Sequence, residues 1–189
     1  ESQTHREMAS GLSMPICFKN GTGGSIQIAV DAMYASQSSH SFLGIDSNGK
    51  ACILNTKGNK YTHIILRGST KNTNFDAKSI KEAMTLINNI NLTPSILVDC
   101  SHANCNKDHK KQKIAFKDVL KQRVIDKNTG IVGIMLESHI NEGNQSLTSN
   151  LSELQYGVSI TDPCINWKET EELLVEANSK IENRKNSIN

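Results

Sequence analysis

Four short apolar runs, each followed by a segment of helical periodicity, constrain this chain more than any other feature. The runs cover residues 14–19, 62–67, 95–99 and 131–137. They are apolar at consecutive rather than alternate positions, which is typical of strands buried on both faces. We therefore predict an α/β fold in which right-handed helical crossovers connect four parallel strands.

The segments between the runs predict the helices. We expect helices at residues 2–12, 25–36, 76–89 and 107–127. Ser25 is a candidate N-cap for the second helix, and Asn166 is one for a final amphipathic helix that contains Leu173 and Ile181. The tail at residues 184–189 is expected to fray.

Residues 41–55 interrupt the alternation of strands and helices. Two short β segments, 41–45 and 51–55, flank the sequence Asp46-Ser47-Asn48-Gly49. Asn-Gly readily adopts positive φ and is a strong signal for a tight hairpin turn. We predict an inserted antiparallel hairpin that does not belong to the parallel sheet.

Composition excludes several classes of function. The 189 residues are 37% hydrophobic and 21% charged, which is typical of a folded domain. A net charge of +2 and an aromatic content of 4% argue against a nucleic-acid partner. No apolar run approaches the ~20 residues of a membrane span. The five cysteines are odd in number and include no Cys-x-x-Cys pair, which predicts free thiols and a cytoplasmic location.

Each predicted strand ends at or near a group capable of chemistry. These groups are Lys19, Arg67, His102 and Glu137. The carboxyl ends of parallel strands share one face, where the active sites of (β/α)8 barrels lie, so we expect the four side chains to converge. The two cations need anionic partners there, either internal carboxylates or an anionic ligand, and we favour a phosphorylated substrate.

His102, Glu137 and Asp162 form a mixed nitrogen and oxygen set. Such a set suits a divalent ion such as Mn²⁺, Fe²⁺, Co²⁺ or Zn²⁺. His102 could equally be a hydrogen-bonded turn residue, and Asp162 could be a loop cap. The residue types by themselves leave both interpretations open.

Six local motifs carry a specific resemblance. They are Phe18-Lys19-Asn20-Gly21-Thr22, Ile65-Leu66-Arg67-Gly68, Asp99-Cys100-Ser101-His102-Ala103-Asn104, Glu137-Ser138-His139, Glu142-Gly143-Asn144-Gln145 and Ser159-Ile160-Thr161-Asp162. Together they resemble the class I, microbial-type 3-deoxy-D-arabino-heptulosonate 7-phosphate (DAHP) synthases, also called phospho-2-dehydro-3-deoxyheptonate aldolases. The resemblance extends from residue 1 to about residue 184.

The resemblance implies a transferase that condenses phosphoenolpyruvate with D-erythrose 4-phosphate and water to give DAHP and phosphate, the first step of the shikimate pathway. It implies that Lys19, Arg67 and His102 are catalytic, and that Lys19, Arg67 and Asp162 contact substrate. It further implies that His102, Glu137 and Asp162 hold one divalent metal ion. Members of the family are (β/α)8 TIM barrels and form homodimers or homotetramers.

The resemblance also implies a role for the hairpin in feedback inhibition by an aromatic amino acid. Five residues fall on positions of the effector pocket: Leu12, Ser13, Phe42, Gly44 and Leu54. Glycine instead of serine at the position of Gly44 accompanies tyrosine instead of phenylalanine in the family. We therefore expect tyrosine to be the effector. His5 also matches a family histidine near the site, with no role implied.

The chain is shorter than a complete barrel, which needs about 250 residues. We expect residues 1–189 to be the C-terminal half of one catalytic barrel, supplying about the last four βα units and the hairpin. A cysteine metal ligand, a Lys-Pro-Arg-Thr segment and two arginines of the family would then precede residue 1, and the segment alone would be inactive. Cys100 and Cys105 are expected to be structural thiols rather than a replacement ligand.

Two other functions remain open at this point. One is a catalytically incomplete half-barrel that serves as a regulatory or assembly module. The other is the related 3-deoxy-octulosonate 8-phosphate synthase, which uses arabinose 5-phosphate.

Overall fold

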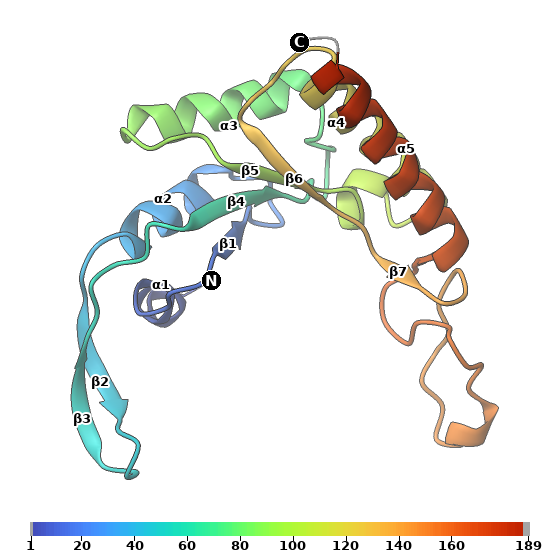
Figure 1. Cartoon of the computed structure of the whole chain (residues 1–189). Coiled ribbons are helices and arrows are strands. Elements are labelled where there is room, and N and C mark those ends of the chain that lie inside the picture. Colours follow the sequence, from blue (N-terminus) through green and yellow to red (C-terminus); the bar gives the residue numbers. More distant parts are fainter. Residues whose placement is uncertain (1, 187–189) are drawn as a thin grey trace.

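A computed structural model describes residues 2–186 and contains one curved parallel sheet as its centre (Figure 1). Its strands are β1 (Ile16–Lys19), β4 (Thr62–Leu66), β5 (Ile96–Asp99) and β6 (Ile131–Met135). They lie in the order β1-β4-β5-β6, and all three neighbouring pairs are parallel. The four strands and their parallel arrangement are as predicted from the apolar runs.

The described helices are α1 (Gln3–Ser10), α2 (Gln27–Ser36), α3 (Ala77–Asn89), α4 (Gln112–Val124) and α5 (Trp167–Asn186). The predicted cap of α2 is wrong, because Ile26 occupies the N-cap position and no side chain caps the helix. The predicted cap of α5 is confirmed, since Asn166 Oδ1 accepts the Glu169 N–H at 2.9 Å.

Both predicted bounds of the fourth helix need correction. Helix α4 ends at Val124 rather than at residue 127, and Lys127 has a left-handed φ of 57°. Helix α4 begins at Gln112 rather than at residue 107, because Asn106 and Lys107 have φ values of 53° and 59° and two 3₁₀ turns, His102–Cys105 and His109–Lys111, precede it. Left-handed residues cannot start a right-handed helix. At the other end of the chain, Arg184 lies within α5, and its Nη1 donates to the Arg123 carbonyl at 2.7 Å, while the fraying of the tail stays a prediction. Residues 187–189 lie outside the described part.

The hairpin has the predicted boundaries. Strands β2 (Ser41–Ile45) and β3 (Ala51–Asn55) are antiparallel and form a separate two-stranded sheet. Asp46 Oδ1 accepts the N–H groups of Asn48 and Lys50, each at 2.9 Å, and Gly49 takes a φ of +78°. The hairpin projects from one end of the curved sheet (Figure 1).

A second small sheet was not predicted. Strands β7 (Ser138–His139) and β8 (Ile165–Asn166) pair in parallel just beyond the end of β6. Two residues are too few to produce a recognisable periodicity. The pairing returns the chain to the end of β6, with Asp162 three residues before β8.

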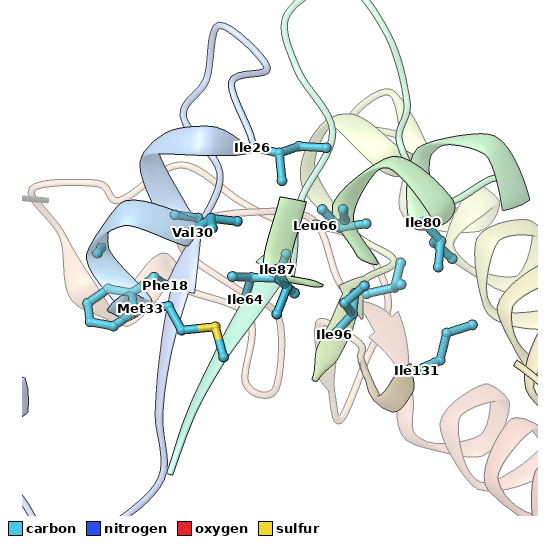
Figure 2. Packing of buried hydrophobic residues seen from close by; sticks show 14 of the residues in the cluster. Phe18, Ile26, Val30, Met33, Ile64, Leu66, Ile80, Ile87, Ile96 and Ile131 are labelled. Carbon is cyan, nitrogen blue, oxygen red and sulfur yellow. The ribbon is translucent and has the colours of Figure 1, made fainter. Parts of the chain in front are cut away.

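The core lies between the sheet and helices α2 and α3 (Figure 2). Buried strand residues in this cluster are Phe18, Ile64, Leu66, Ile96, Val98 and Ile131. Val30 and Met33 of α2 and Ile80 and Ile87 of α3 pack against them. Because strand side chains alternate between faces, Lys19 and Asp99 belong to the opposite face of the sheet. Within residues 2–186, no helix combines the length and apolarity needed to cross a membrane.

Candidate active site

The structure brings together Lys19, Asp99, His102, Glu137 and Asp162 at the carboxyl ends of the parallel strands. Lys19 Nζ lies 2.8 Å from Asp99 Oδ2, and His102 Nδ1 lies 2.9 Å from the same oxygen. On the other side of the imidazole, His102 Nε2 lies 3.5 Å from Glu137 Oε1 and 3.5 Å from Asp162 Oδ2. Residues far apart in the sequence, from Lys19 to Asp162, therefore form one connected group.

Three of these side chains could hold a metal ion. One ligand atom from each of His102, Glu137 and Asp162 can be chosen so that all lie within 4.8 Å of one another. One imidazole and two carboxylates fit a divalent first-row ion by donor type. Glu137 is further oriented by Ser101, whose Oγ donates to Oε2 at 2.9 Å. The residues present therefore fit the divalent ion that the sequence predicts.

The backbone at His102 is unusual. Its φ is +50°, a left-handed conformation that β-carbon sterics disfavour and that recurs at functional sites. The facing loop after β4 packs closely on this turn, since an added Cβ at Gly68 (φ +73°) would lie 2.8 Å from the Ala103 Cβ. Gly68 is thus needed for the approach that sets Arg67 beside the His102 turn.

The two predicted cations have different surroundings. Lys19 forms an ion pair with the buried Asp99, so an internal carboxylate partly neutralises it. Arg67 is half-buried, and its guanidinium has no carboxylate partner within residues 2–186. The sequence left open whether internal carboxylates or an anionic ligand neutralise the two cations. Lys19 pairs with an internal carboxylate, whereas Arg67 remains free for an anionic ligand.

A buried asparagine network supports the site and was missed in the sequence. Asn20 Oδ1 accepts the Arg67 backbone N–H at 2.8 Å and the Asn74 side-chain amide at 3.2 Å. The Asn74 backbone N–H donates to Asn104 Oδ1, and Asn104 Nδ2 donates to the Asp99 carbonyl, both at 2.8 Å. Asn20 and Asn104 lie within the conspicuous motifs, but asparagine in loops is too common to signal a network.

The predicted effector residues surround a separate cavity of about 790 Å³ between the end of α1 and the hairpin. Leu12, Ser13, Phe42 and Leu54 line it. Gly44 is not on the lining, but an added Cβ there would overlap Leu54 Cδ1. The absence of a side chain at Gly44 therefore accommodates the Leu54 side chain.

His5 lies on the exposed surface of α1. Its Nδ1 accepts the Ser2 backbone N–H at 3.1 Å, which completes a helix cap. All five cysteines are free thiols. Burial raises the pKa of Cys100 and of Cys105, as is typical of buried structural thiols.

A comparison with protein families shows to which family the chain belongs. The model described as the DAHP synthetase I family matches residues 1–175. The chain belongs to the DAHP synthetase I family.

Relatives of this DAHP synthetase I chain agree with the family match. It is 48% identical over 182 residues to the protein named phospho-2-dehydro-3-deoxyheptonate aldolase, Tyr-sensitive, of Enterobacter agglomerans, covering 96% of this chain and 84% of that protein. It is 47% identical over 181 residues to the Escherichia coli (strain K12) protein of the same name, covering 96% of this chain and 50% of that one.

A solved structure extends the comparison to the fold. The phospho-2-dehydro-3-deoxyheptonate aldolase of Francisella tularensis SCHU S4 superposes with a TM-score of 0.90 at 38% identity, over 97% of this chain and 53% of that chain. The mixed α/β architecture with its parallel sheet is thus shared within the DAHP synthetase I family. The chain spans about half the length of the Escherichia coli and Francisella proteins.

Proposed function

We propose that the protein containing this chain is a DAHP synthase, a transferase that condenses phosphoenolpyruvate with D-erythrose 4-phosphate and water to give DAHP and phosphate. The observation that carries the proposal is the convergence of Lys19 with the His102, Glu137 and Asp162 group on one edge of a parallel sheet, in a chain of this family. The names of its relatives support the same activity.

Substrate binding is the proposed task of the two cations. Phosphoenolpyruvate carries a carboxylate and a phosphate, and the free guanidinium of Arg67 can bind either in bidentate fashion. Lys19 supplies a second positive charge from β1, with one ammonium proton directed at Asp99. Together they would neutralise and orient the anionic substrate.

His102, Glu137 and Asp162 are the proposed holders of a divalent metal ion such as Mn²⁺, Fe²⁺, Co²⁺ or Zn²⁺. When bound, such an ion would polarise the aldehyde of erythrose 4-phosphate for attack by the enol carbon of phosphoenolpyruvate. Asp162 is 62% exposed at its side chain, so it is also accessible for the proposed contact with substrate.

We further propose that this chain forms about half of a (β/α)8 barrel, with residues 41–55 as a regulatory insertion. An all-parallel sheet with β1 and β6 at its edges supports this, as does the structural match to a chain about twice as long. The cavity beside the hairpin, together with the names of the Tyr-sensitive relatives, supports tyrosine as the feedback effector.

The activity is tested on the complete protein that contains this chain. We expect product with phosphoenolpyruvate and erythrose 4-phosphate, loss of activity with a chelator, and recovery with Mn²⁺. Turnover with arabinose 5-phosphate in place of erythrose 4-phosphate would indicate the octulosonate synthase instead. No turnover with either aldose, with and without added Mn²⁺, would favour the half-barrel module.

A further inference from the structure

We propose that Asp99 is a positioning residue that holds Lys19 and His102 through a single carboxylate oxygen, so that one group sets the geometry of both the substrate site and the metal site. The inference rests on the proposed function, because that function gives Lys19 and His102 their roles. It adds a residue that contacts neither substrate nor metal.

Both carboxylate oxygens of Asp99 have partners within the protein. Oδ2 lies 2.8 Å from Lys19 Nζ and 2.9 Å from His102 Nδ1. Oδ1 accepts the Ser101 backbone N–H at 2.9 Å. The side chain is 2% exposed, so water cannot replace any of these partners. A buried carboxylate is costly unless paired, and here its ion-pair partner within residues 2–186 is Lys19, with the His102 imidazole against the same oxygen.

The position of Oδ2 determines which nitrogen of His102 can bind a metal. An anionic acceptor at Nδ1 favours a proton on that nitrogen, and this leaves the lone pair of Nε2 directed toward Glu137 and Asp162. The 2.9 Å contact is close but poorly aligned for a hydrogen bond, so the negative carboxylate favours the Nδ1 proton of the neutral imidazole through its electrostatic field. The left-handed backbone of His102 brings the ring to this oxygen.

The same oxygen orients the ammonium of Lys19. An ammonium group has three protons, and directing one at Asp99 leaves two for the oxygens of an anionic ligand. Asp99 itself is fixed on β5, where Asn104 Nδ2 donates to its carbonyl at 2.8 Å. The lysine is therefore held to a rigid strand rather than to a mobile loop.

The substitution Asp99→Asn tests whether the carboxylate oxygens position Lys19 and His102, because it keeps a buried side chain of the same shape. An asparagine preserves the shape but must direct its NH₂ group either at Ser101 N–H or at the pair Lys19 and His102, and each choice opposes donor to donor. The matched control is Asp126→Asn, which removes an exposed carboxylate paired with Lys121 at 3.1 Å on the surface, away from the site.

Two measurements on the complete protein test the proposal. Equilibrium dialysis with Mn²⁺ alone gives a metal Kd, and kinetics at saturating Mn²⁺ give the KM for phosphoenolpyruvate separately from kcat. For Asp99→Asn we expect the Mn²⁺ Kd to rise about 10- to 100-fold, as for other partners of metal-binding histidines. We expect the KM to rise about 10-fold, the effect of losing one charge-assisted hydrogen bond. The control should change neither by more than about 2-fold.

The outcomes distinguish this inference from the proposed function. Unchanged Kd and KM in Asp99→Asn, or a change in only one of them, would overturn the shared role. If Asp99→Asn does not fold, Asp99→Glu decides, since it keeps the charge but displaces it by one methylene, and it should also weaken both sites. Failure of both variants to fold would make Asp99 a stability residue and overturn the proposal. A wild-type protein without Mn²⁺ binding or turnover would instead refute the proposed function, and the inference with it.

Discussion

At the scale of single residues, the site combines one neutralised cation with one free cation. The Lys19 ammonium faces the buried Asp99, whereas the Arg67 side chain is paired with no carboxylate of residues 2–186. The backbone of Arg67 is nevertheless fixed, because its N–H donates to the buried Asn20. A fixed backbone with an unpaired guanidinium is suited to binding an anion.

The first prediction concerns this free guanidinium. For Arg67→Ala in the complete protein we expect the KM for phosphoenolpyruvate to rise about 10- to 100-fold, because charge-assisted hydrogen bonds to the substrate are lost, and kcat to fall as well. Steady-state kinetics measure both. Lys71→Ala, which removes an exposed cation from the following loop, is the control. An unchanged KM in Arg67→Ala would remove this residue from the substrate site.

The second prediction concerns His102. Its φ of +50° means that alanine there would add backbone strain to the loss of a ligand, whereas asparagine tolerates the left-handed region. We therefore expect His102→Asn to fold with a near-native melting temperature but to lose Mn²⁺ binding and activity together. Equilibrium dialysis and a thermal melt are the measurements. Retained activity without metal dependence would contradict the metal assignment.

At the scale of elements, the hairpin and the Asn166 cap of α5 could be predicted from local sequence, whereas the predicted Ser25 cap of α2 was wrong. Asp76 caps α3 by accepting the N–H groups of Lys78 and Ser79 at 3.0 and 3.1 Å. The hairpin was predicted to the residue because Asn-Gly specifies the turn and the turn specifies the register. The predicted start of α4 was wrong because Asn106 and Lys107, which precede the helix, have left-handed backbones that a right-handed helix cannot include.

The third prediction follows from the cap of α3. Partial burial acts to raise the pKa of Asp76, but hydrogen bonds from Ser79 and Lys78 outweigh it and hold the pKa below the ordinary 3.8. We expect Asp76→Ala to reduce the free energy of unfolding by about 1 kcal/mol at pH 7. Because the folded pKa is lowered, this contribution is complete above the ordinary pKa and is lost as pH falls through the lowered value.

Urea denaturation of the complete protein at pH 7 and at pH 2 to 3 measures the effect. Asp126→Ala, at an exposed ion pair, should cost at most about 0.5 kcal/mol at pH 7. An equal loss for Asp76→Ala at both pH values would show that the carboxylate charge is not what stabilises the helix.

The fourth prediction concerns the hairpin. In Gly44→Ser, the new Cβ would overlap Leu54 Cδ1, so Leu54 must move relative to the cavity that it lines. We expect inhibition by tyrosine to weaken and inhibition by phenylalanine to strengthen, measured as the ratio of the two inhibitory concentrations. Leu43 is 83% exposed and lies on the other face of the hairpin, so the control Leu43→Ser should leave the ratio unchanged. The same result in both variants would contradict the role of Gly44.

At the scale of the whole molecule, the described chain is an arch with one covered face (Figure 1). Helices α2 and α3 cover one side of the sheet, and β1 and β6 are its two edges within residues 2–186. An apolar groove of about 580 Å³ runs beside β6, lined by residues of α4 and α5 such as Leu120 and Leu174. Exposed strand edges with apolar surroundings favour association.

The fifth prediction follows from this arch. Produced alone, residues 1–189 should bind a dye specific for exposed apolar surface, associate in solution and lack DAHP synthase activity. The complete protein should be active and bind the dye weakly. Dye fluorescence measures the exposed apolar surface, light scattering measures association, and an assay of DAHP formation measures activity. A monomeric, dye-silent segment would instead favour an independent half-barrel module.

The sequence by itself determined the order of elements, the parallel class of the sheet and the hairpin, because apolar runs and turn residues act over a few positions. It also indicated His102, Glu137 and Asp162, since each belongs to a local motif. Only the tertiary structure decided that Asp99 contacts both Lys19 and His102 through one oxygen. That contact joins residues 80 positions apart and depends on how parallel strands align, which no local pattern encodes.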